Sequence, residues 1–141
     1  MRCPKLIIFS TEKNINPDKI DDLFKIVGWE TRNKNTIKKM LQKSSFVFSV
    51  WDDQSLVGFG RIVEDGIMCM FYDVCVHKDY QNNGIGTKIM ETLIDQVKDK
   101  QYISIGLFVS EDNPRATNFY EKFGFKNVNN GMELVRYMKI E

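Results

Sequence analysis

The amino-acid sequence predicts a mixed α/β (α+β) fold, with a mainly antiparallel central sheet of about six to seven strands and helices on both faces. Two observations lead to this prediction. Past residue 80, helix-like and strand-like segments alternate, which predicts a parallel strand pair joined by a right-handed crossover. Before residue 80, apolar segments separated by short polar turns predict an antiparallel meander of three strands, at residues 46–51, 56–63 and 67–76.

The residues before the meander predict one strand, at 5–10, and two helices. Asn16 followed by Pro17 is typical of a helix start, with Asn as the cap and Pro in the first turn. Apolar residues then recur at helical spacing, and Gly28 suits the end of this helix. A second short helix is expected to follow, although the segment 31–39 is rich in Arg, Asn and Lys and suits a loop equally well.

The C-terminal half predicts two helices, each followed by a strand. Residues 84–100 place their apolar side chains on one half of a helix surface and most charged side chains on the other half. Asn113 before Pro114 predicts the start of the second helix, and Gly124 suits its end as a left-handed cap. The two strands are expected at 102–109 and 132–140.

The composition is that of one globular domain over residues 1–141. The formal net charge of +1 argues against a protein that binds nucleic acid through bulk positive charge. Three cysteines and one histidine show no paired metal-ligand spacing, so we expect no metal site and free thiols. The sequence shows neither a signal peptide nor a membrane-spanning segment, so we expect a cytoplasmic protein with no membrane partner.

One turn combines two glycines with a helix start: Gln81-Asn82-Asn83-Gly84-Ile85-Gly86. The first N–H groups of a helix lack internal partners and the helix dipole adds positive charge, so this turn predicts an anion site. Glycine lets the backbone approach a pyrophosphate closely, and asparagine tolerates positive φ. By itself the pattern suits a loop glycine plus a packing glycine equally well. A dinucleotide site is disfavoured because the third glycine of that fingerprint is absent.

Two spaced motifs together resemble the GNAT (GCN5-related N-acetyltransferase) superfamily. The segment 72–80 looks like the strand and loop that precede the family's coenzyme A signature. The order of elements agrees from about residue 5 to the C-terminus, so the chain resembles a small single-domain bacterial or plastid member. The motifs are Gln81-x-x-Gly84-x-Gly86 and Asn113-x-x-Ala116-x-x-x-Tyr120-x-x-x-Gly124-Phe125.

The resemblance implies that acetyl-CoA is the co-substrate and that its acetyl group moves directly to a primary amine. It also implies that two parallel strands splay apart around the pantetheine arm, with the Val76 N–H polarising the thioester carbonyl. Tyr120 is the implied general acid for the departing thiol, although a core aromatic is its alternative role. The implied acetyl-CoA contacts are Val74, Val76, Gln81, Asn82, Asn83, Gly84, Ile85, Gly86, Thr87, Lys88, Asn113, Ala116 and Tyr120.

The pair Asn82-Asn83 departs from the family pattern, because many members carry glycine or a basic residue there. Asparagine supplies the geometry without the charge. We therefore expect the phosphate contacts to shift toward backbone N–H groups, with the positive charge supplied by Lys88 or by other basic residues outside the loop. Asn113 has a second possible role, because an asparagine next to Pro114 also suits a simple helix cap.

The catalytic base is less clearly marked. An alkylammonium of pKa ~10.4 costs about 4.6 kcal/mol to deprotonate at pH 7, so a base is expected. Asp73 is the nearest carboxylate and the candidate, although strand alternation points it away from Val74 and Val76 unless a bulge re-aims it. Its alternative role is a structural acceptor for loop N–H groups. Weaker candidates, which also suit solvated charges in turns, are Glu30, Glu64 and Asp65.

The remaining predictions concern the acceptor and the reaction type. Cys75 lacks a Cys–His–acid arrangement, so direct transfer is favoured over an acyl-enzyme. The acceptor is expected to be a small-molecule amine. The resemblance extends to a subgroup associated with arylalkylamines through Gly28-Trp29, the segment 56–61 and Phe123-Gly124-Phe125. A catalytically silent acyl-CoA sensor and a protein amino-group acetyltransferase remain alternatives. Either a monomer or a homodimer is expected.

Overall fold

The computed structural model describes residues 6–110, 112–128 and 131–134. The chain divides into two compact units, Met1–Phe108 and Val109–Glu141. The first unit holds the sheet and three of the helices, and the second holds the C-terminal helix. The expectation of one domain over residues 1–141 stays a prediction, and each unit is described by itself below.

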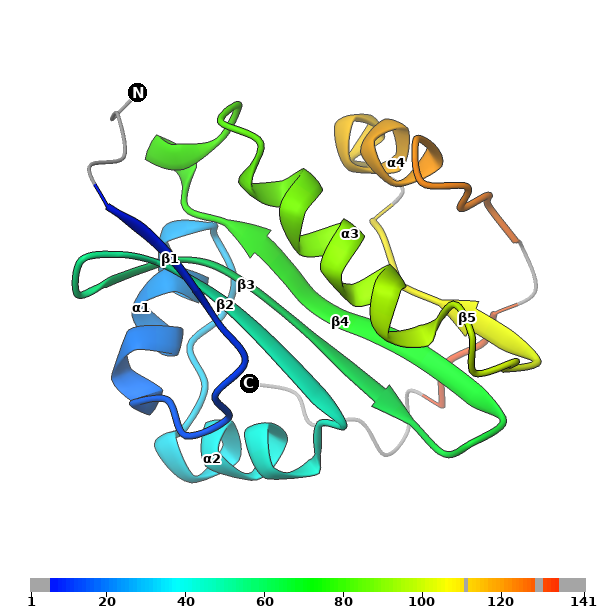
Figure 1. The fold of residues 1–141 in the computed structure, drawn as a ribbon, viewed down its shortest axis with the longest axis horizontal. Helices are drawn as coiled ribbons and strands as arrows, with labels where there is room; N and C mark the ends of the chain where they lie inside the picture. Colours follow the sequence, from blue (N-terminus) through cyan, green and yellow to red (C-terminus); the bar gives the residue numbers. More distant parts are fainter. Residues whose placement is uncertain (1–5, 111, 129–130, 135–141) are drawn as a thin grey trace. The chain divides into compact units, whose positions relative to one another are not determined.

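The first unit is built on a five-stranded sheet whose spatial order follows the chain order (Figure 1). The meander expected from the sequence is confirmed, because the first four strands pair antiparallel with their neighbours. The last two strands pair in parallel, as the crossover pattern predicted. The strands are β1 (Ile7–Ser10), β2 (Phe46–Asp52), β3 (Ser55–Glu64), β4 (Met68–Val76) and β5 (Ser104–Gly106).

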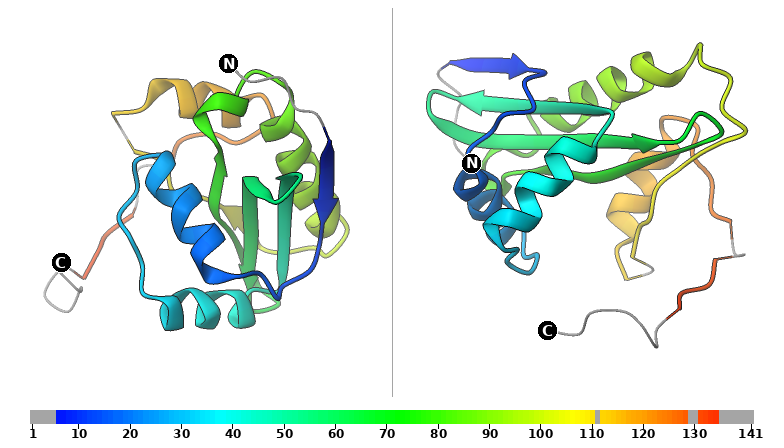
Figure 2. Two further views of the ribbon diagram at one scale, coloured as in Figure 1. Left: turned by 90° about the vertical axis from the view of Figure 1, so that its left-hand side faces the viewer. Right: turned by 90° about the horizontal axis from the view of Figure 1, so that it is seen from below.

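Helices cover both faces of this sheet, with α1 (Pro17–Ile26) and α2 (Lys34–Lys43) on one face and α3 (Ile85–Val97) on the other (Figure 2). Asn16 caps α1 by accepting from the Asp18 N–H at 3.0 Å, as predicted. The loop alternative for 31–39 is wrong from Lys34 onward, because an Asn33 cap starts a helix there.

The core has a layer on each side of the sheet because β3 alternates between the two faces. Phe59 packs edge-on against Phe24 of α1, with ring centroids 6.0 Å apart. Gly58 and Gly60 face α3 so closely that a Cβ on Gly60 would lie 2.9 Å from Ile89 Cγ2. The layer under α1 and α2 consists of Ile15, Ile20, Leu23, Phe24, Ile37, Leu41, Val47, Leu56, Phe59 and Cys75.

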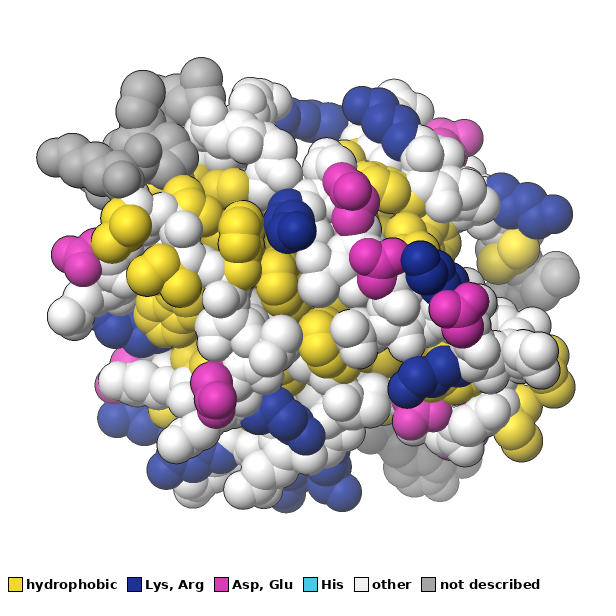
Figure 3. Space-filling view, viewed as in Figure 1, with side chains coloured by type: hydrophobic (Ala, Val, Ile, Leu, Met, Phe, Trp, Pro, Cys, Tyr) yellow, Lys and Arg dark blue, Asp and Glu magenta, His cyan; other side chains and the backbone are white. Residues whose placement is uncertain are grey.

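The edge strand β1 leaves apolar side chains at the surface. Leu6, Ile8 and Phe9 are 45–56% exposed. Figure 3 shows hydrophobic side chains gathered at this end of the face that carries α3, whereas acidic and basic side chains alternate along the rest of it. Phe9 stacks on Phe48 with ring centroids 5.7 Å apart, which limits how much of its ring meets water.

The parallel pairing of β4 and β5 is shorter than the sequence predicted. A strand was expected over 102–109, but β5 has three residues, and its pairs with β4 end at Met70–Gly106. β4 continues to Val76, so its second half runs on after the two strands have stopped pairing. Pairing that ends halfway along β4 agrees with strands that part, as the GNAT resemblance implied.

The second unit contains α4 (Pro114–Glu121). Asn113 caps it by accepting from the Ala116 N–H at 3.1 Å, and Gly124 follows with φ of +96°, as predicted for a left-handed helix end. Of the last strand expected at 132–140, residues 132–134 are described and are not in a strand. The rest of that segment lies outside the described residues.

Candidate functional site

The turn before α3 leaves the first N–H groups of the helix without a capping side chain. Asn82 and Gly84 have left-handed φ values of +66° and +79°, so the chain makes a tight loop there. Gly84 is the N-cap residue and makes no side-chain cap hydrogen bond. Since α3 also directs its positive dipole end at this loop, the geometry of this N-terminus suits an anion, and the anion site itself stays a prediction.

The amide side chains of Gln81 and Asn83 stabilise the loop through hydrogen bonds to backbone carbonyl oxygens. Gln81 Nε2 donates to the Val76 carbonyl oxygen at 3.2 Å, and Asn83 Nδ2 donates to the Tyr80 carbonyl oxygen at 3.2 Å. Tyr80 is buried and donates through its hydroxyl to Asp52 Oδ2 at 2.6 Å. The turn is therefore tied to both β4 and β2, while Thr87 and Lys88 in the first turn of α3 are exposed.

The second half of β4 presents an edge of backbone groups next to this turn. The His77 N–H donates to the Val57 carbonyl oxygen of β3 at 2.8 Å, and successive N–H groups along a strand point to opposite edges. The N–H groups of Val76 and Val74 therefore point away from β3. Among the described residues, no strand pairs with that edge beyond Met70.

A β-bulge interrupts β4 at Asp73. Phe59 of β3 pairs with Cys75 and Arg61 pairs with Tyr72, so two residues of β4 lie opposite one residue of β3. Asp73 takes a left-handed φ of +57° in the bulge. The bulge places Tyr72 on the face of α1 and α2 with Arg61, whereas regular alternation would have placed it with Val74.

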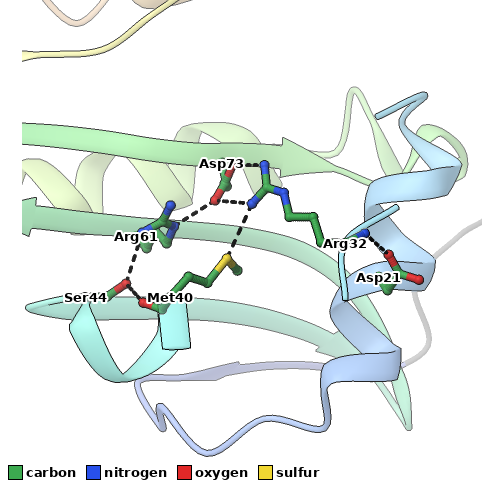
Figure 4. Close-up of polar contacts among 6 residues, drawn as sticks. All are labelled: Asp21, Arg32, Met40, Ser44, Arg61 and Asp73. Carbon is green, nitrogen blue, oxygen red and sulfur yellow. Dashed lines mark hydrogen bonds and ion pairs between the residues drawn. The ribbon is translucent and has the colours of Figure 1, made fainter. Parts of the chain in front are cut away.

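The Asp73 carboxylate lies between two arginines (Figure 4). Arg32 donates to it through Nη1 and Nη2, both at 3.1 Å, and Arg61 donates through Nε at 2.7 Å. Arg32 comes from the loop between α1 and α2, so this cluster joins that loop to β3 and β4. Strand alternation predicted that Asp73 points away from the Val74 side, and its partners lie on that opposite face.

The two arginines keep Asp73 ionised. Burial by itself raises the pKa of this carboxyl, but the hydrogen bonds and charges of Arg32 and then Arg61 outweigh burial, so the pKa of Asp73 lies below its ordinary value of 3.8. Its side chain is only 10% exposed, which shields the ion pairs from solvent. Asp73 thus accepts hydrogen bonds from two guanidinium groups rather than from the loop N–H groups expected of a structural acceptor, and its role as a base stays a prediction.

Comparison with known proteins shows the family to which this chain belongs. Residues 14–125 match the Acetyltransferase (GNAT) family, a range that includes the turn, β4 and α4. The chain belongs to the GNAT family. It is an N-acetyltransferase, and this family uses acetyl-CoA as its co-substrate.

Individual relatives of this N-acetyltransferase carry matching names. The chain is 34% identical over 126 residues to "Uncharacterized N-acetyltransferase ycf52" of Pyropia yezoensis, covering 86% of this chain and 71% of that protein. It is 28% identical over 111 residues to "Serotonin N-acetyltransferase 2, chloroplastic" of Oryza sativa subsp. japonica, covering 75% and 54%.

Solved structures show the same fold. A probable acetyltransferase from meticillin-resistant Staphylococcus aureus superposes with a TM-score of 0.83 at 23% identity, covering 96% of this chain and 100% of that one. The ribosomal-protein-S18-alanine N-acetyltransferase of Escherichia coli gives a TM-score of 0.76 at 18% identity, covering 88% and 80%. At these identities the likeness concerns the GNAT fold and no particular acceptor.

The second unit of this N-acetyltransferase holds the other predicted site residues. Asn113 uses its amide oxygen as the cap, and its amide nitrogen has no hydrogen-bond partner in the described part of the chain. Tyr120 is half-buried and contacts Phe119 and Phe125 edge-on, with ring centroids 5.4 and 6.2 Å away. The helix cap is therefore confirmed, whereas a contact of the Asn113 amide nitrogen with the pantetheine stays a prediction.

Other polar residues of this N-acetyltransferase have structural partners. Asp65 Oδ1 accepts from the N–H groups of Ile67 and Met68 at 2.9 and 2.8 Å, and Glu64 accepts from the Gly66 N–H at 2.7 Å. Both carboxylates therefore serve the β3–β4 turn. Within the ranges described above, no group of three or more His, Cys, Asp or Glu side chains is placed to hold a metal ion.

The two described thiols of this N-acetyltransferase, Cys69 and Cys75, are both buried. Cys75 belongs to the buried core, and burial raises the pKa of its thiol well above the usual range. Burial also raises the pKa of Cys69 to about 11. His77 Nδ1 accepts from the Asp79 N–H at 3.0 Å, so this histidine caps the short helix that follows. Neither thiol is the reactive thiolate that an acyl-enzyme requires.

Sequence reasoning missed Arg32 and Arg61. A charged residue inside the otherwise apolar strand 56–63 is a weak signal that Arg61 needs a buried partner. Nothing in the basic segment after Gly28 distinguishes Arg32 from its neighbours. Only the fold brings these residues together, since Arg32 and Asp73 are 41 positions apart.

Proposed function

We propose that this chain transfers the acetyl group of acetyl-CoA directly to the primary amine of a small molecule. The observation that carries the proposal is the N-terminus of α3, which has no capping side chain and lies beside a turn with left-handed residues. A pyrophosphate there accepts hydrogen bonds from the N–H groups of the first helical turn and benefits from the helix dipole.

The phosphate contacts in this proposal are mainly backbone contacts. Gln81 and Asn83 already use their amide nitrogens to brace the loop, which supports the expectation that the backbone of residues 81–88 carries the affinity. Lys88 is exposed in the first turn of α3 and lies 5.5 Å over the Phe9 ring. Its ammonium adds positive charge close to the phosphates.

The pantetheine arm is proposed to pair with the unpaired edge of β4. The N–H groups of Val74 and Val76 point to that edge, so they are available to the amide and thioester oxygens of the cofactor. The amine nitrogen attacks the thioester carbon, the C–S bond breaks, and the Val76 N–H stabilises the developing oxyanion. The family motif adds Asn113, Ala116 and Tyr120 as contacts, with Tyr120 donating a proton to the departing sulfur.

The proton of the acceptor ammonium needs a separate route. Asp73 is the candidate base, but its two arginine partners lower its pKa, and a weaker base drives proton removal less. We therefore propose that water removes this proton and that Asp73 holds the bulge. A pH–rate profile of Asp73→Asn between pH 5 and 9 distinguishes proton removal by water from proton removal by Asp73. If water removes the proton, the profile keeps its shape. If Asp73 is the base, turnover falls by about 10²-fold or more.

Gly84→Val tests the phosphate turn, defined as residues 81–86, which are proposed to bind the pyrophosphate. A β-branched residue at φ of +79° is strained, so we expect the Kd for acetyl-CoA to rise at least about fivefold by isothermal titration calorimetry. Gly66→Val is the matched control, because Gly66 has φ of +92° in equally open space but lies in the β3–β4 turn. Equal Kd values of the two variants for acetyl-CoA would show that the turn does not bind this cofactor.

The acceptor is identified by turnover. Release of free thiol from acetyl-CoA is measured across a panel of amines that includes arylalkylamines, which the rice relative named as a serotonin N-acetyltransferase supports. Tight acetyl-CoA binding without turnover of any amine favours the sensor alternative. Acetylation of proteins alone favours the protein acetyltransferase, an activity named in the Escherichia coli structural neighbour.

A further inference from the structure

We propose that the acceptor is a primary amine that also carries an oxyanion, a carboxylate or a phosphate, at the end remote from the amine, and that Arg32 and Arg61 bind this oxyanion. This inference rests on the proposed function and names the substrate class of the same site. Its starting point is a charge imbalance, since two guanidinium groups share the single carboxylate of Asp73. The cluster thus has one positive charge in excess.

Part of the hydrogen-bonding capacity of the cluster is unused. A guanidinium carries five N–H donors. Arg61 donates through Nε to Asp73 and through Nη1 to Ser44 Oγ, whereas its Nη2 meets no acceptor among the described residues. In that part of the chain no buried side-chain nitrogen or oxygen lacks a partner, so Arg61 Nη2 reaches solvent.

Arg32 offers a second open donor. It contacts Asp73 through Nη1 and Nη2 and the Met40 sulfur through Nη1, which leaves its Nε without an acceptor in the described ranges. Its side chain is 34% exposed, compared with 14% for Arg61. Each of the two arginines therefore keeps an open N–H donor on a planar guanidinium group. Such donors suit the oxygens of a carboxylate or a phosphate.

Both guanidinium groups are held in place before any ligand arrives. Arg32 lies 4.8 Å over the Phe24 ring, and its backbone N–H donates to Asp21 at 3.0 Å. Arg61 lies 5.1 Å over the Tyr72 ring. Side chains fixed by rings and by Asp73 lose little freedom on binding, so an anion gains more affinity from them than from mobile surface lysines.

The position of the cluster gives the approximate spacing of the two groups of the acceptor. Asp73 precedes Val76 by three residues, which is about 10 Å along an extended strand, and the bulge shortens this distance. The amine is proposed to react next to the Val76 N–H. The oxyanion therefore lies several bonds away from the amine, which excludes α-amino acids that react at their α-amino group.

A matched set of acceptors tests the inference: phenethylamine, 4-(2-aminoethyl)benzoate and the phosphate ester of tyramine. We expect kcat/KM to be at least about tenfold higher for an anionic member than for phenethylamine at low salt, as charge-assisted hydrogen bonds provide. The benzoate and phosphate members distinguish the two oxyanions. Equal kcat/KM for all three amines overturns the proposal.

Variants assign the effect to the two arginines. Arg32→Gln and Arg61→Gln are expected to reduce the preference for the anionic acceptor about tenfold or more, and Arg61→Lys to retain part of it. Lys98→Gln is the control, because it removes one positive charge from the end of α3. A preference that survives in both glutamine variants, or falls equally in Lys98→Gln, overturns the assignment.

Equilibrium binding separates this inference from the proposed function. If no amine is acetylated, the proposed function fails, but calorimetric titration with 4-(2-aminoethyl)benzoate and phenethylamine still tests the anion site. Tighter binding of the benzoate that depends on Arg32 and Arg61 supports the site without turnover. Equal binding of the two amines overturns it.

Discussion

Asp73 shows how one residue joins three parts of the molecule. Its left-handed backbone forms the β4 bulge, and its carboxylate holds Arg61 of β3 and Arg32 of the α1–α2 loop. Asp and Asn tolerate this backbone region better than most residues, which suits aspartate to the bulge. The same residue therefore sets the backbone of β4 next to Val74 and the position of the loop.

Asp73→Asn tests the contribution of these ion pairs to stability. The substitution leaves two arginines facing a neutral amide, so we expect the free energy of unfolding at pH 7 to fall by about 3 kcal/mol. The folded-state pKa of Asp73 is lowered, so its contribution is complete above the ordinary carboxyl pKa of 3.8 and is lost as the pH falls through the folded value. Urea unfolding at pH 7 and near pH 3 should show a difference that shrinks in acid. A constant difference would contradict the ion-pair explanation.

Cys75→Ala tests direct transfer at the residue scale. The thiol is buried and its pKa is raised, so we expect kcat to stay within about threefold of the unsubstituted protein. Stability should fall by about 1 kcal/mol, because the change removes one buried atom from the core. Steady-state kinetics and urea unfolding measure the two effects. Loss of turnover in a folded variant would instead indicate an acyl-enzyme.

At the scale of the elements, the contact of α3 with β3 places the phosphate turn. Gly58 and Gly60 leave room for Ile85, Ile89 and Leu93, so the helix lies directly on the strand. Its N-terminus is then held near the C-terminal end of β4, where the edge of Val74 and Val76 begins. Without this close approach the proposed anion site at the start of α3 would not lie next to the edge of β4 that is proposed to bind the thioester.

Gly60→Val tests this close approach. The added side chain overlaps Ile89, whose Cγ2 would lie 2.9 Å from the new Cβ, so α3 has to shift. We expect a loss of about 1–3 kcal/mol in the free energy of unfolding and weaker acetyl-CoA binding. Gly131→Ala is the control, because a Cβ there meets no atom within 4 Å. Similar losses for both variants would show that the effect is not specific to the β3–α3 contact.

At the scale of the whole molecule, ligand protection tests each unit separately. Acetyl-CoA at 100 times its Kd stabilises the folded chain by about 2.7 kcal/mol. In hydrogen exchange we expect slower exchange at residues 81–88 of the first unit and at 113–120 of the second. Protection of the first segment alone would remove Asn113 and Tyr120 from the proposed site.

Other whole-chain properties follow less directly. Among the described residues, no helix is long and apolar enough to cross a membrane. The cytoplasmic location and the choice between monomer and homodimer stay predictions. The relatives include proteins named as chloroplastic, which is a statement about those proteins.

Much of the local structure was predictable because its causes are local. Asn16 and Asn113 cap helices through bonds to N–H groups two and three residues away, and short polar turns define the meander. The length of β5 was not predictable, because the apolar residues of 102–109 suit a strand throughout. How far a strand extends depends on the neighbour that pairs with it, and the pairs with β4 end at Gly106.

The order of the elements, the turn before α3 and the GNAT resemblance were all predictable from the amino-acid sequence, since spacing along the chain encodes each of these. The tertiary structure alone decided what Asp73 contacts. Arg32, Arg61 and Asp73 meet because a bulge and a loop bring distant positions together. No regular spacing of residues in the sequence indicates ion pairs of this kind. The role of a carboxylate depends on the charges around it, and only the folded chain shows those charges.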